Sequence, residues 1–428
     1  MKILNTKDEN FNQEFSELLK RGAMDIDSVS LRVKNILDEI KKEGNKALIE
    51  HNAMFDKWRA STQEDLEVSL EDMKNAYENL DETLKSALHL AYDRIESYHK
   101  KLMPKTWIEY DKHGSMLGQK VTPVDRAGLY IPGGKAAYPS SLLMNAIPAI
   151  VAGVEEIVVC TPAPNNELNA LLLGACHLCG IKKVFKVGGA SAIGAMAFGT
   201  QSIPKVDVIT GPGNIFVATA KKMVFGEVNI DMIAGPSEIG ILADDSARAD
   251  FLAIDLLSQA EHDEMASSIL ITPSSALSVE VDREVEKFLA KLSRYEIARK
   301  SIDERGAIIV TKDMDEAINL MNQIAPEHLE VVTTSPMELL SKIKHAGAIF
   351  LGSYTPEAIG DYIAGPNHTL PTGGTAKFYS PLSVDNFLKK SSIISMTQKG
   401  IEEIGEASAL LADTEGLDAH ALSVRVRL

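Results

Sequence analysis

Four short polar segments in the second half of the chain each place a histidine beside or near a carboxylate. They are Q-A-E-H (259–262), P-E-H-L (326–329), G-D-Y-I-A-G-P-N-H (360–368) and E-G-L-D-A-H (415–420). Imidazole and carboxylate groups bind metals and transfer protons, whereas a hydrophobic core needs neither. If the fold brings these segments together, they supply a metal-ligand set with further acids and bases, which is typical of an active site.

The first and third segments suggest a metal site. Gln259 and His262 lie three residues apart on a predicted helix and therefore share a face of it. Alone they are better explained as a polar helix face, because glutamine is a rare metal ligand. Asp361 and His420 would complete a set of two nitrogens and two oxygens, which suits zinc, with manganese or cobalt as alternatives. As isolated residues, Asp361 would be a helix cap and His420 a helix-face residue near the chain end.

Glu327 and His328 form an adjacent acid–imidazole pair. Pro326 is expected to hold Ala325 in an extended conformation, so the helix of M-D-E-A-I-N-L-M-N-Q-I should end there and the strand of L-E-V-V-T-T should follow. A turn between two elements is a favoured place for catalytic groups. His328 could take a proton from an alcohol, and Glu327 could activate water. An ordinary surface turn is the alternative for an isolated pair.

Two glycine turns could bind an anion through main-chain N–H groups, namely I-P-G-G-K-A-A-Y-P-S-S (131–141) and G-P-G-N (211–214). Neither matches G-x-G-x-x-G or a Walker A loop, so they are predicted only to be ligand-binding turns. Cys176 and Cys179 form a C-x-x-C inside an apolar helix, without a second pair. Packing in the core is the better interpretation of these thiols.

The composition excludes several classes of function. The chain has 428 residues with 60 acidic against 44 basic side chains, a formal net charge of −16. Such a charge repels phosphate backbones and argues against a nucleic-acid partner. The N-terminus contains no apolar signal segment, and the apolar run 142–154 is too short to span a bilayer. We therefore expect a cytoplasmic protein with no membrane partner.

The elements that must position these residues follow an α/β rhythm. Charged amphipathic helices fill the first hundred residues, and strand-length apolar runs then alternate with helices from about Pro123. This pattern predicts two Rossmann-like parallel-sheet domains with a helical N-terminal region and a small C-terminal tail. The expected boundaries are 1–120 for the helical region, 121–236 for an inserted Rossmann-like domain, 237–382 for the second α/β domain, and 383–428 for the tail.

Seven segments in order carry a resemblance to a known family: L-Y-I-P-G-G-K-A-A-Y-P-S-S-L-L-M-N-A-I-P-A, T-G-P-G-N, D-M-I-A-G-P-S-E, D-L-L-S-Q-A-E-H-D, A-P-E-H-L-E, P-E-A-I-G-D-Y-I-A-G-P-N-H-T-L-P-T and E-G-L-D-A-H, with Arg425 beyond. On these segments the chain resembles histidinol dehydrogenase over nearly its whole length. The resemblance implies a homodimer that oxidises L-histidinol to L-histidine through L-histidinaldehyde. It also implies one Zn²⁺ per subunit and two NAD⁺ per reaction, at the last steps of histidine biosynthesis.

The resemblance also implies roles for individual positions. The implied metal ligands are Gln259, His262, Asp361 and His420. The implied catalytic pair is Glu327 and His328. The implied substrate contacts are Ser237, Gln259, His262, His328, Asp361, His368, Glu415 and His420. The implied NAD contacts are Tyr130, Ser191 and Asn214. Because the family's C-terminal tail reaches the neighbouring subunit, Glu415 and His420 are expected to act there, which places the tail at a shared active site.

One position departs from the family pattern. Ser191, in V-G-G-A-S-A, stands where the family usually has a glutamine that contacts NAD, so this contact would be lost or bridged by water. Two alternatives remain open from the residues. One is a related NAD-dependent dehydrogenase of another small alcohol. The other is a zinc hydrolase, because a metal with a Glu and a His also activates water, although it would leave both glycine turns unexplained.

Overall fold

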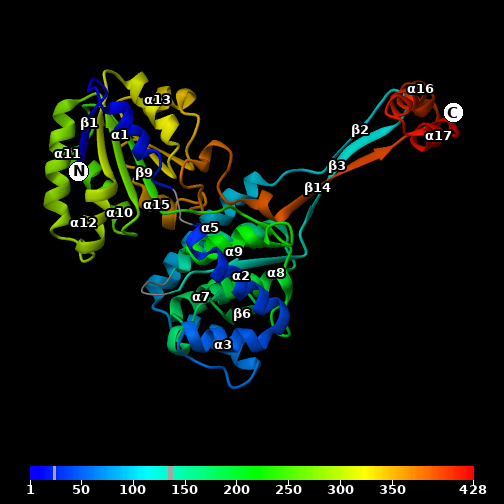
Figure 1. Cartoon of the computed structure of the whole chain (residues 1–428), viewed down its shortest axis with the longest axis horizontal. Helices are drawn as coiled ribbons and strands as arrows, with labels where there is room; N and C mark the ends of the chain where they lie inside the picture. The colour runs from blue at the N-terminus through cyan, green and yellow to red at the C-terminus, as the bar shows by residue number, and fades with distance from the viewer. Residues whose placement is uncertain (23–25, 134–137) are drawn as a thin grey trace.

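The computed structural model describes residues 1–22, 26–133 and 138–428 of the chain. Two α/β bodies lie beside each other, and a narrow arm extends from them to a small helical tip at the C-terminus (Figure 1). The two parallel sheets, each covered by helices, agree with the predicted fold class. Across the described residues, no helix is both long and apolar enough to cross a membrane.

The first body contains a five-stranded parallel sheet with the order β6-β5-β4-β7-β8. The strands are β4 (Arg126–Tyr130), β5 (Glu156–Thr161), β6 (Lys183–Lys186), β7 (Val208–Thr210) and β8 (Asn229–Ile230). The chain therefore winds outward from β4 in one direction and then from β7 in the other, as in Rossmann folds. The crevice between β4 and β7, where the direction changes, is the expected ligand site of such a sheet.

Helices cover both faces of this sheet. One core layer packs around α4 (Leu70–Glu78), α5 (Glu82–Leu102), α6 (Pro139–Ala152) and α7 (Ala170–Leu178), and the other around α2 (Ile26–Glu43), α3 (Asn45–Phe55), α8 (Gly189–Phe198) and α9 (Ile215–Val224). On α2, the buried residues Val29, Val33, Leu37 and Ile40 recur at the three- and four-residue spacing of one helix face. Cys176 and Cys179 are buried free thiols, as the sequence predicts.

The second body contains a six-stranded parallel sheet with the order β1-β11-β10-β9-β12-β13. The strands are β1 (Lys2–Asn5), β9 (Glu238–Ala243), β10 (Ser267–Thr272), β11 (Gly306–Val310), β12 (His328–Val332) and β13 (Ala348–Leu351). The helices are α1 (Phe11–Leu18), α10 (Ala249–Ala260), α11 (Ser275–Leu289), α12 (Tyr295–Arg305), α13 (Met314–Ile324), α14 (Pro336–Leu339) and α15 (Glu357–Tyr362). Core layers separate α10, α11 and α12 on one face from α1 and α13 on the other.

The arm is an antiparallel three-stranded sheet with the order β14-β3-β2. Its elements are β2 (Trp107–Tyr110), β3 (Met116–Pro123), β14 (Leu388–Ser395), α16 (Gln398–Thr414) and α17 (Asp418–Arg425). The five 3₁₀ turns of the described chain are η1 (Glu64–Leu66), η2 (Pro164–Asn166), η3 (Leu340–Lys342), η4 (Thr375–Lys377) and η5 (Val384–Phe387). In Figure 1 the tip formed by α16 and α17 lies far from both parallel sheets.

Three strands, β1, β2 and most of β3, fall in the region 1–120 that the sequence predicts to be helical. β1 is four residues long, too short to show a strand periodicity. The arm strands lack one consistently buried face, so their sequences do not alternate cleanly between apolar and polar residues. The boundaries 1–120, 121–236, 237–382 and 383–428 stay a prediction.

The connection from the last strand of the first sheet to β9 of the second is short. β8 ends at Ile230 and β9 begins at Glu238, so residues 231–237 span the whole crossing. A connection of this length requires the carboxyl end of β8 to lie near the amino end of β9. The carboxyl edge of the first sheet is therefore turned toward the amino edge of the second.

Phe387 tests whether the segment after the second sheet is part of the first core. Its side chain is fully buried in the core layer of α5 and α6. Phe387→Ala should therefore lower the free energy of unfolding by about 3–5 kcal/mol. Phe378→Ala makes the same chemical change at a side chain that is 73% exposed and should stay within about 0.5 kcal/mol of wild type. Denaturant midpoints followed by circular dichroism measure both, and equal midpoints would contradict this packing.

Candidate functional site

The helix-to-strand turn that carries Glu327 and His328 forms as predicted, with one difference. α13 ends at Ile324, and β12 begins at His328. The prediction of an extended Ala325 is wrong, because this residue is left-handed with φ 49° and its N–H bonds to the carbonyl oxygen of Met321 at 2.8 Å. A left-handed residue both caps the helix and reverses the chain in one step, and the turn needs both before β12 can enter the sheet.

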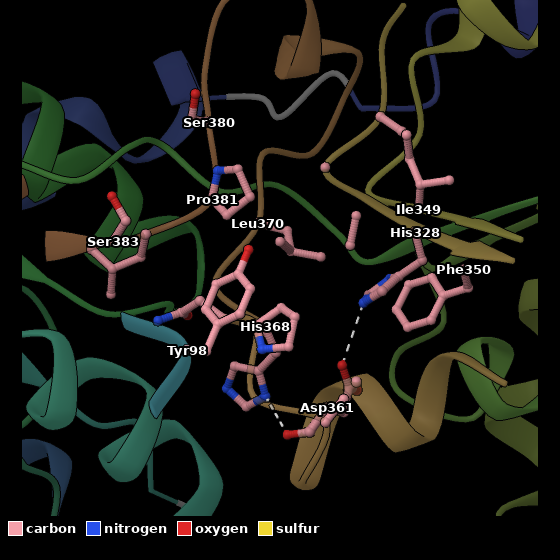
Figure 2. Close-up of a pocket in the computed structure, with 18 of the residues that line it drawn as sticks. Tyr98, His328, Ile349, Phe350, Asp361, His368, Leu370, Ser380, Pro381 and Ser383 are labelled. Atoms are coloured by element: carbon pink, nitrogen blue, oxygen red, sulfur yellow. Dashed lines mark hydrogen bonds and ion pairs between the residues drawn. The ribbon is translucent and has the colours of Figure 1, made fainter. Parts of the chain in front are cut away.

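The His328 ring is buried and fixed in one tautomer. Its Nδ1 lies 3.1 Å from the carbonyl oxygen of Glu238. A carbonyl oxygen only accepts hydrogen bonds, so Nδ1 carries the hydrogen and donates it. Nε2 then faces Asp361, whose Oδ1 lies 3.3 Å away (Figure 2). A buried imidazole whose second nitrogen faces a cavity is suited to accept a proton from a bound molecule.

Carboxylates surround this imidazole. Glu327 Oε2 and Glu357 Oε2 each lie 3.7 Å from Nδ1 of His328. Burial has the largest single effect on the ring and lowers its pKa, but the charges of Glu327, Glu357 and Asp361 together outweigh burial and raise the pKa well above its usual value. The site therefore concentrates negative charge around one titratable nitrogen.

Glu327 is held beside this ring by the main chain. Its Oε2 accepts a hydrogen bond from the N–H of Glu238 at 2.8 Å. Burial raises the pKa of Glu327 to about 8, and this effect exceeds the lowering by His328. A carboxyl group that titrates near neutral pH can act as an acid or as a base. Glu327 and His328 can therefore take part in two separate proton transfers.

Donor atoms that could hold a metal ion meet beside this pair. Ligand atoms of His262, Glu357 and Asp361 all lie within 4.8 Å of one another. Gln259 comes from the same helix end as His262, and its buried Oε1 has no hydrogen-bond partner within the described chain. A buried acceptor without a partner beside a cluster of oxygens and an imidazole fits a cation such as zinc. The chain thus brings His262, Glu357 and Asp361 to one place, with Gln259 one helical turn before His262.

Two predicted site residues lie elsewhere. Glu415 ends α16 and His420 lies on α17, both exposed at the tip of the arm. Figure 1 shows this tip far from α10 and α15, so a single chain does not bring His420 to Asp361. Ser237, another predicted substrate contact, is half-buried directly before β9.

A cavity of about 580 Å³ opens beside His328 and Asp361. His368 also lines it, with Nδ1 2.8 Å from the main-chain oxygen of Asp361 and Nε2 3.4 Å from Ser141 Oγ. Burial lowers the pKa of His368 and favours its neutral ring. Figure 2 shows an apolar wall of Tyr98, Phe350 and Leu370 around these polar groups. The cavity has the mixed apolar and polar lining of a small-molecule site.

Two predicted cofactor residues lie at the carboxyl edge of the first sheet. Tyr130 ends β4, and its hydroxyl accepts the N–H of Gly189 at 3.2 Å. Asn214 follows β7 and caps α9, accepting the N–H groups of Phe216 and Val217 at 3.1 and 3.3 Å. Both lie beyond the carboxyl ends of β4 and β7, where a dinucleotide is expected. Part of the predicted 131–141 turn, residues 134–137, lies outside the described residues.

Ser191 is placed differently from the other cofactor candidates. It is buried in the first turn of α8, and its Oγ lies 2.8 Å from Nδ1 of His51. Nε2 of His51 lies 2.8 Å from a carboxylate oxygen of Glu39. The carboxylate accepts the Nε2 hydrogen when the ring is neutral, so Nδ1 accepts from Ser191. The serine hydroxyl thus donates inside the protein, and sequence reasoning missed this set because its members come from three separate segments.

Further acids behind the site were also missed. Glu330 Oε1 accepts the main-chain N–H of Glu357 at 2.8 Å, and Ser258 donates to Glu357 Oε1 at 3.0 Å. Both glutamates are about 1% exposed. The only signal in the sequence was an acidic residue within an apolar strand, L-E-V-V, which is unusual for a buried position. These bonds join α10, β12 and α15 behind the cavity.

Comparison with known proteins gives a consistent result. The family model for histidinol dehydrogenase matches residues 19–428. The histidinol dehydrogenase of Sulfurimonas denitrificans is 69% identical over 423 residues, covering 99% of this chain and 98% of that protein. That of Wolinella succinogenes is 64% identical over 428 residues, covering 100% and 99%. The crystal structure of histidinol dehydrogenase from Elizabethkingia anophelis matches with a TM-score of 0.95 at 36% identity, covering 100% and 98%.

The donor cluster predicts a measurable metal affinity. His262→Ala removes one nitrogen donor, so the affinity for Zn²⁺ should fall by more than about 100-fold, because the loss of even an outer partner of a ligand costs about 10- to 100-fold. Competition against a chelating dye measures this affinity. Glu280→Gln, at an exposed position of α11, is the control and should leave it unchanged. Wild-type affinity in both His262→Ala and Asp361→Asn would reject the cluster as a metal site.

Proposed function

We propose, on the premise that this chain belongs to the histidinol dehydrogenase family, that it oxidises L-histidinol to L-histidine through L-histidinaldehyde with two NAD⁺ and one Zn²⁺ per subunit. The family's enzymes are NAD-dependent oxidoreductases of histidine biosynthesis, and L-histidinol is their substrate. The observation that carries the proposed chemistry is the fixed tautomer of His328, whose Nε2 faces the cavity beside Glu327 and Asp361.

His328 is the base of the first oxidation in this proposal. The surrounding carboxylates raise the pKa of His328 and favour its protonated ring, whereas a cation held at Asp361 would offset their charge and favour the neutral ring. Because Nδ1 donates to the carbonyl of Glu238, the Nε2 lone pair of that neutral ring would face the substrate hydroxyl. Nε2 takes the hydroxyl proton as the carbon-bound hydrogen leaves as hydride for NAD⁺. A positioned base of this kind contributes about 10²- to 10⁴-fold to the rate.

Glu327 serves the second oxidation. The hydrated aldehyde forms when water adds to the carbonyl carbon, and this step needs a base for one water proton. Burial, which raises the pKa of Glu327 to about 8, makes its carboxylate a stronger base than an exposed glutamate. Enclosure of the aldehyde between the two steps protects a reactive intermediate from side reactions. This need for two bases explains why an acid and an imidazole are adjacent.

Gln259, His262 and Asp361, with His420 of the partner subunit, hold the zinc ion in the proposal. The partnerless Oε1 of Gln259 and the clustered donors of His262 and Asp361 support this assignment. When bound, the ion supplies positive charge that anchors the amine and imidazole of the substrate and offsets the charge of Asp361. Glu357, which joins the same cluster, already accepts from Ser258, and we assign it to the support of the site.

The remaining contacts divide between substrate and cofactor. Ser237, His368 and, from the neighbouring subunit, Glu415 would contact L-histidinol. Tyr130 and Asn214 would contact NAD⁺ in the crevice between β4 and β7. Ser191 contributes little direct contact, because its hydroxyl already donates to His51.

A homodimer would complete the site. Leu410, Leu411, Leu422 and Val426 on α16 and α17 are each more than 60% exposed in the single chain. Apolar side chains gathered at the tip of an arm are typical of a surface that another subunit covers. The same arm would carry Glu415 and His420 to the neighbouring cavity. The cytoplasmic location stays part of the proposal, and cell fractionation tests it.

The stoichiometry and Glu327→Gln test the two-step chemistry together. Wild-type protein with zinc should yield two NADH per L-histidinol consumed, measured by absorbance. Glu327→Gln should slow oxidation of L-histidinaldehyde by about 10²-fold or more, while the first oxidation, followed in a single turnover, changes far less. Glu280→Gln should match wild type in both. Equal losses in both steps would contradict the division of labour between Glu327 and His328.

Mixed dimers test whether the arm acts on the partner. His328→Asn and His420→Asn should each be inactive alone. When the two variants are unfolded and refolded together in equal amounts, a shared site predicts recovery of about a quarter of wild-type activity, because half of the dimers are mixed and each has one intact site. Refolded single variants are the controls. No recovery, with mixed dimers demonstrated by differently tagged chains, would rule out the shared site.

A further inference from the structure

Lys221 of α9 and Asp231, the first residue after β8, form a buried ion pair in the first body. The two residues are 2% and 6% exposed. The proposed chemistry uses neither of them. A buried pair of charges is weak evidence for stability, because apolar residues of similar size often replace such a pair without loss. The contacts of this pair therefore need another explanation.

Both polar main-chain groups of Gly211 are held by this pair. Lys221 Nζ donates to the Gly211 carbonyl oxygen at 2.9 Å, and Asp231 Oδ2 accepts the Gly211 N–H at 2.9 Å. Gly211 has φ +118°, and a side chain there would overlap the main-chain oxygen of Tyr130. The orientation of the two peptide groups that flank Gly211 is thus fixed by these side chains.

Gly211 opens the G-P-G-N turn that leads from β7 to α9. The turn flanks the crevice between β4 and β7, and it ends at Asn214, the cap of α9. Because Lys221 and Asp231 hold both polar main-chain atoms of Gly211, they help to position Asn214 and the first N–H groups of α9. Those groups are the ones that a dinucleotide phosphate would meet.

The same pair also fixes the start of the connection to the second body. Asp231 Oδ1 accepts the N–H of Met232 at 2.6 Å. Residues 231–237 then lead to Ser237 and the amino end of β9, with Gly235 N–H donating to Thr372 Oγ1 at 2.5 Å on the way. The carboxylate of Asp231 therefore anchors both the G-P-G-N turn and this connection.

We infer that Lys221 and Asp231 are positioning residues that hold the G-P-G-N turn in register for the dinucleotide cofactor. This inference rests on the proposed NAD⁺ site. The pair touches neither cofactor nor substrate, and it acts through the peptide of Gly211. Its loss should therefore weaken the use of NAD⁺ while leaving the substrate and metal sites intact.

The test separates positioning from stability. Lys221→Met leaves the charge of Asp231 buried without a counter-ion, so it should both destabilise the protein and raise the KM for NAD⁺. The double variant Lys221→Met/Asp231→Leu removes both charges and should regain most of the lost denaturant midpoint. Its KM for NAD⁺ should stay about 10- to 100-fold above wild type, because a small displacement of a positioning group is enough for such a loss.

Further measurements distinguish a positioning role from a general loss of structure, which would affect every parameter together. The KM for L-histidinol and the zinc content should remain those of wild type, and kcat at saturating NAD⁺ should change by less than about 3-fold. Lys222→Met, at the exposed neighbouring position of α9, is the matched control and should leave every parameter unchanged. NADH binding followed by fluorescence should weaken in parallel with the KM for NAD⁺.

Two results would overturn the inference, and they differ from each other. A double variant that keeps the wild-type KM for NAD⁺, in a protein whose wild type forms NADH from L-histidinol, rejects the positioning role and leaves the proposed function intact. A zinc-loaded wild type that neither forms NADH nor binds it rejects the proposed function, and the inference falls with it.

Discussion

The connection 231–237 is the constraint on which the arrangement of the molecule depends. Because it is short, the first sheet must present its carboxyl edge to the amino edge of the second. Open α/β sheets usually bind ligands at the carboxyl ends of their strands. The proposed NAD⁺ contacts of the first sheet follow this rule, whereas Glu327 and His328 stand at the amino end of β12. The proposed catalytic pair therefore stands on the edge of the second sheet that this connection turns toward the first sheet.

The second organising feature is the excess of acid around a single imidazole. Burial raises the pKa of Glu357 to about 7 and that of Glu327 to about 8, since an ionised carboxylate is costly away from water. Among the described residues, His328 offsets the charge of both glutamates and His262 and His368 also act on Asp361, and a bound cation would add to them. A site built in this way favours a metal ion and a mobile proton together. The stability of this region of the fold and the proposed proton transfers therefore depend on the same buried charges.

Local features can be predicted from the sequence, but contacts between residues far apart in the chain cannot. Each β-α unit follows from adjacent apolar runs and turns, and Glu327 with His328 follows from one helix-to-strand turn. The position of Glu357 beside His262, and that of Ser191 beside His51, depend on how separate helices pack. The arm strands escaped prediction because they do not bury one consistent face, and periodicity reports only one-sided burial.

The hydrogen bond from His328 Nδ1 to the carbonyl of Glu238 has a consequence for timing. A proton that Nε2 accepts has to leave from Nε2 again, because the far side of the ring is committed to a group that cannot relay it. Under the proposed chemistry, His328 must therefore release this proton through the same cavity that holds the aldehyde. Between the two oxidations, the cavity must therefore let a proton leave while it retains the much larger aldehyde.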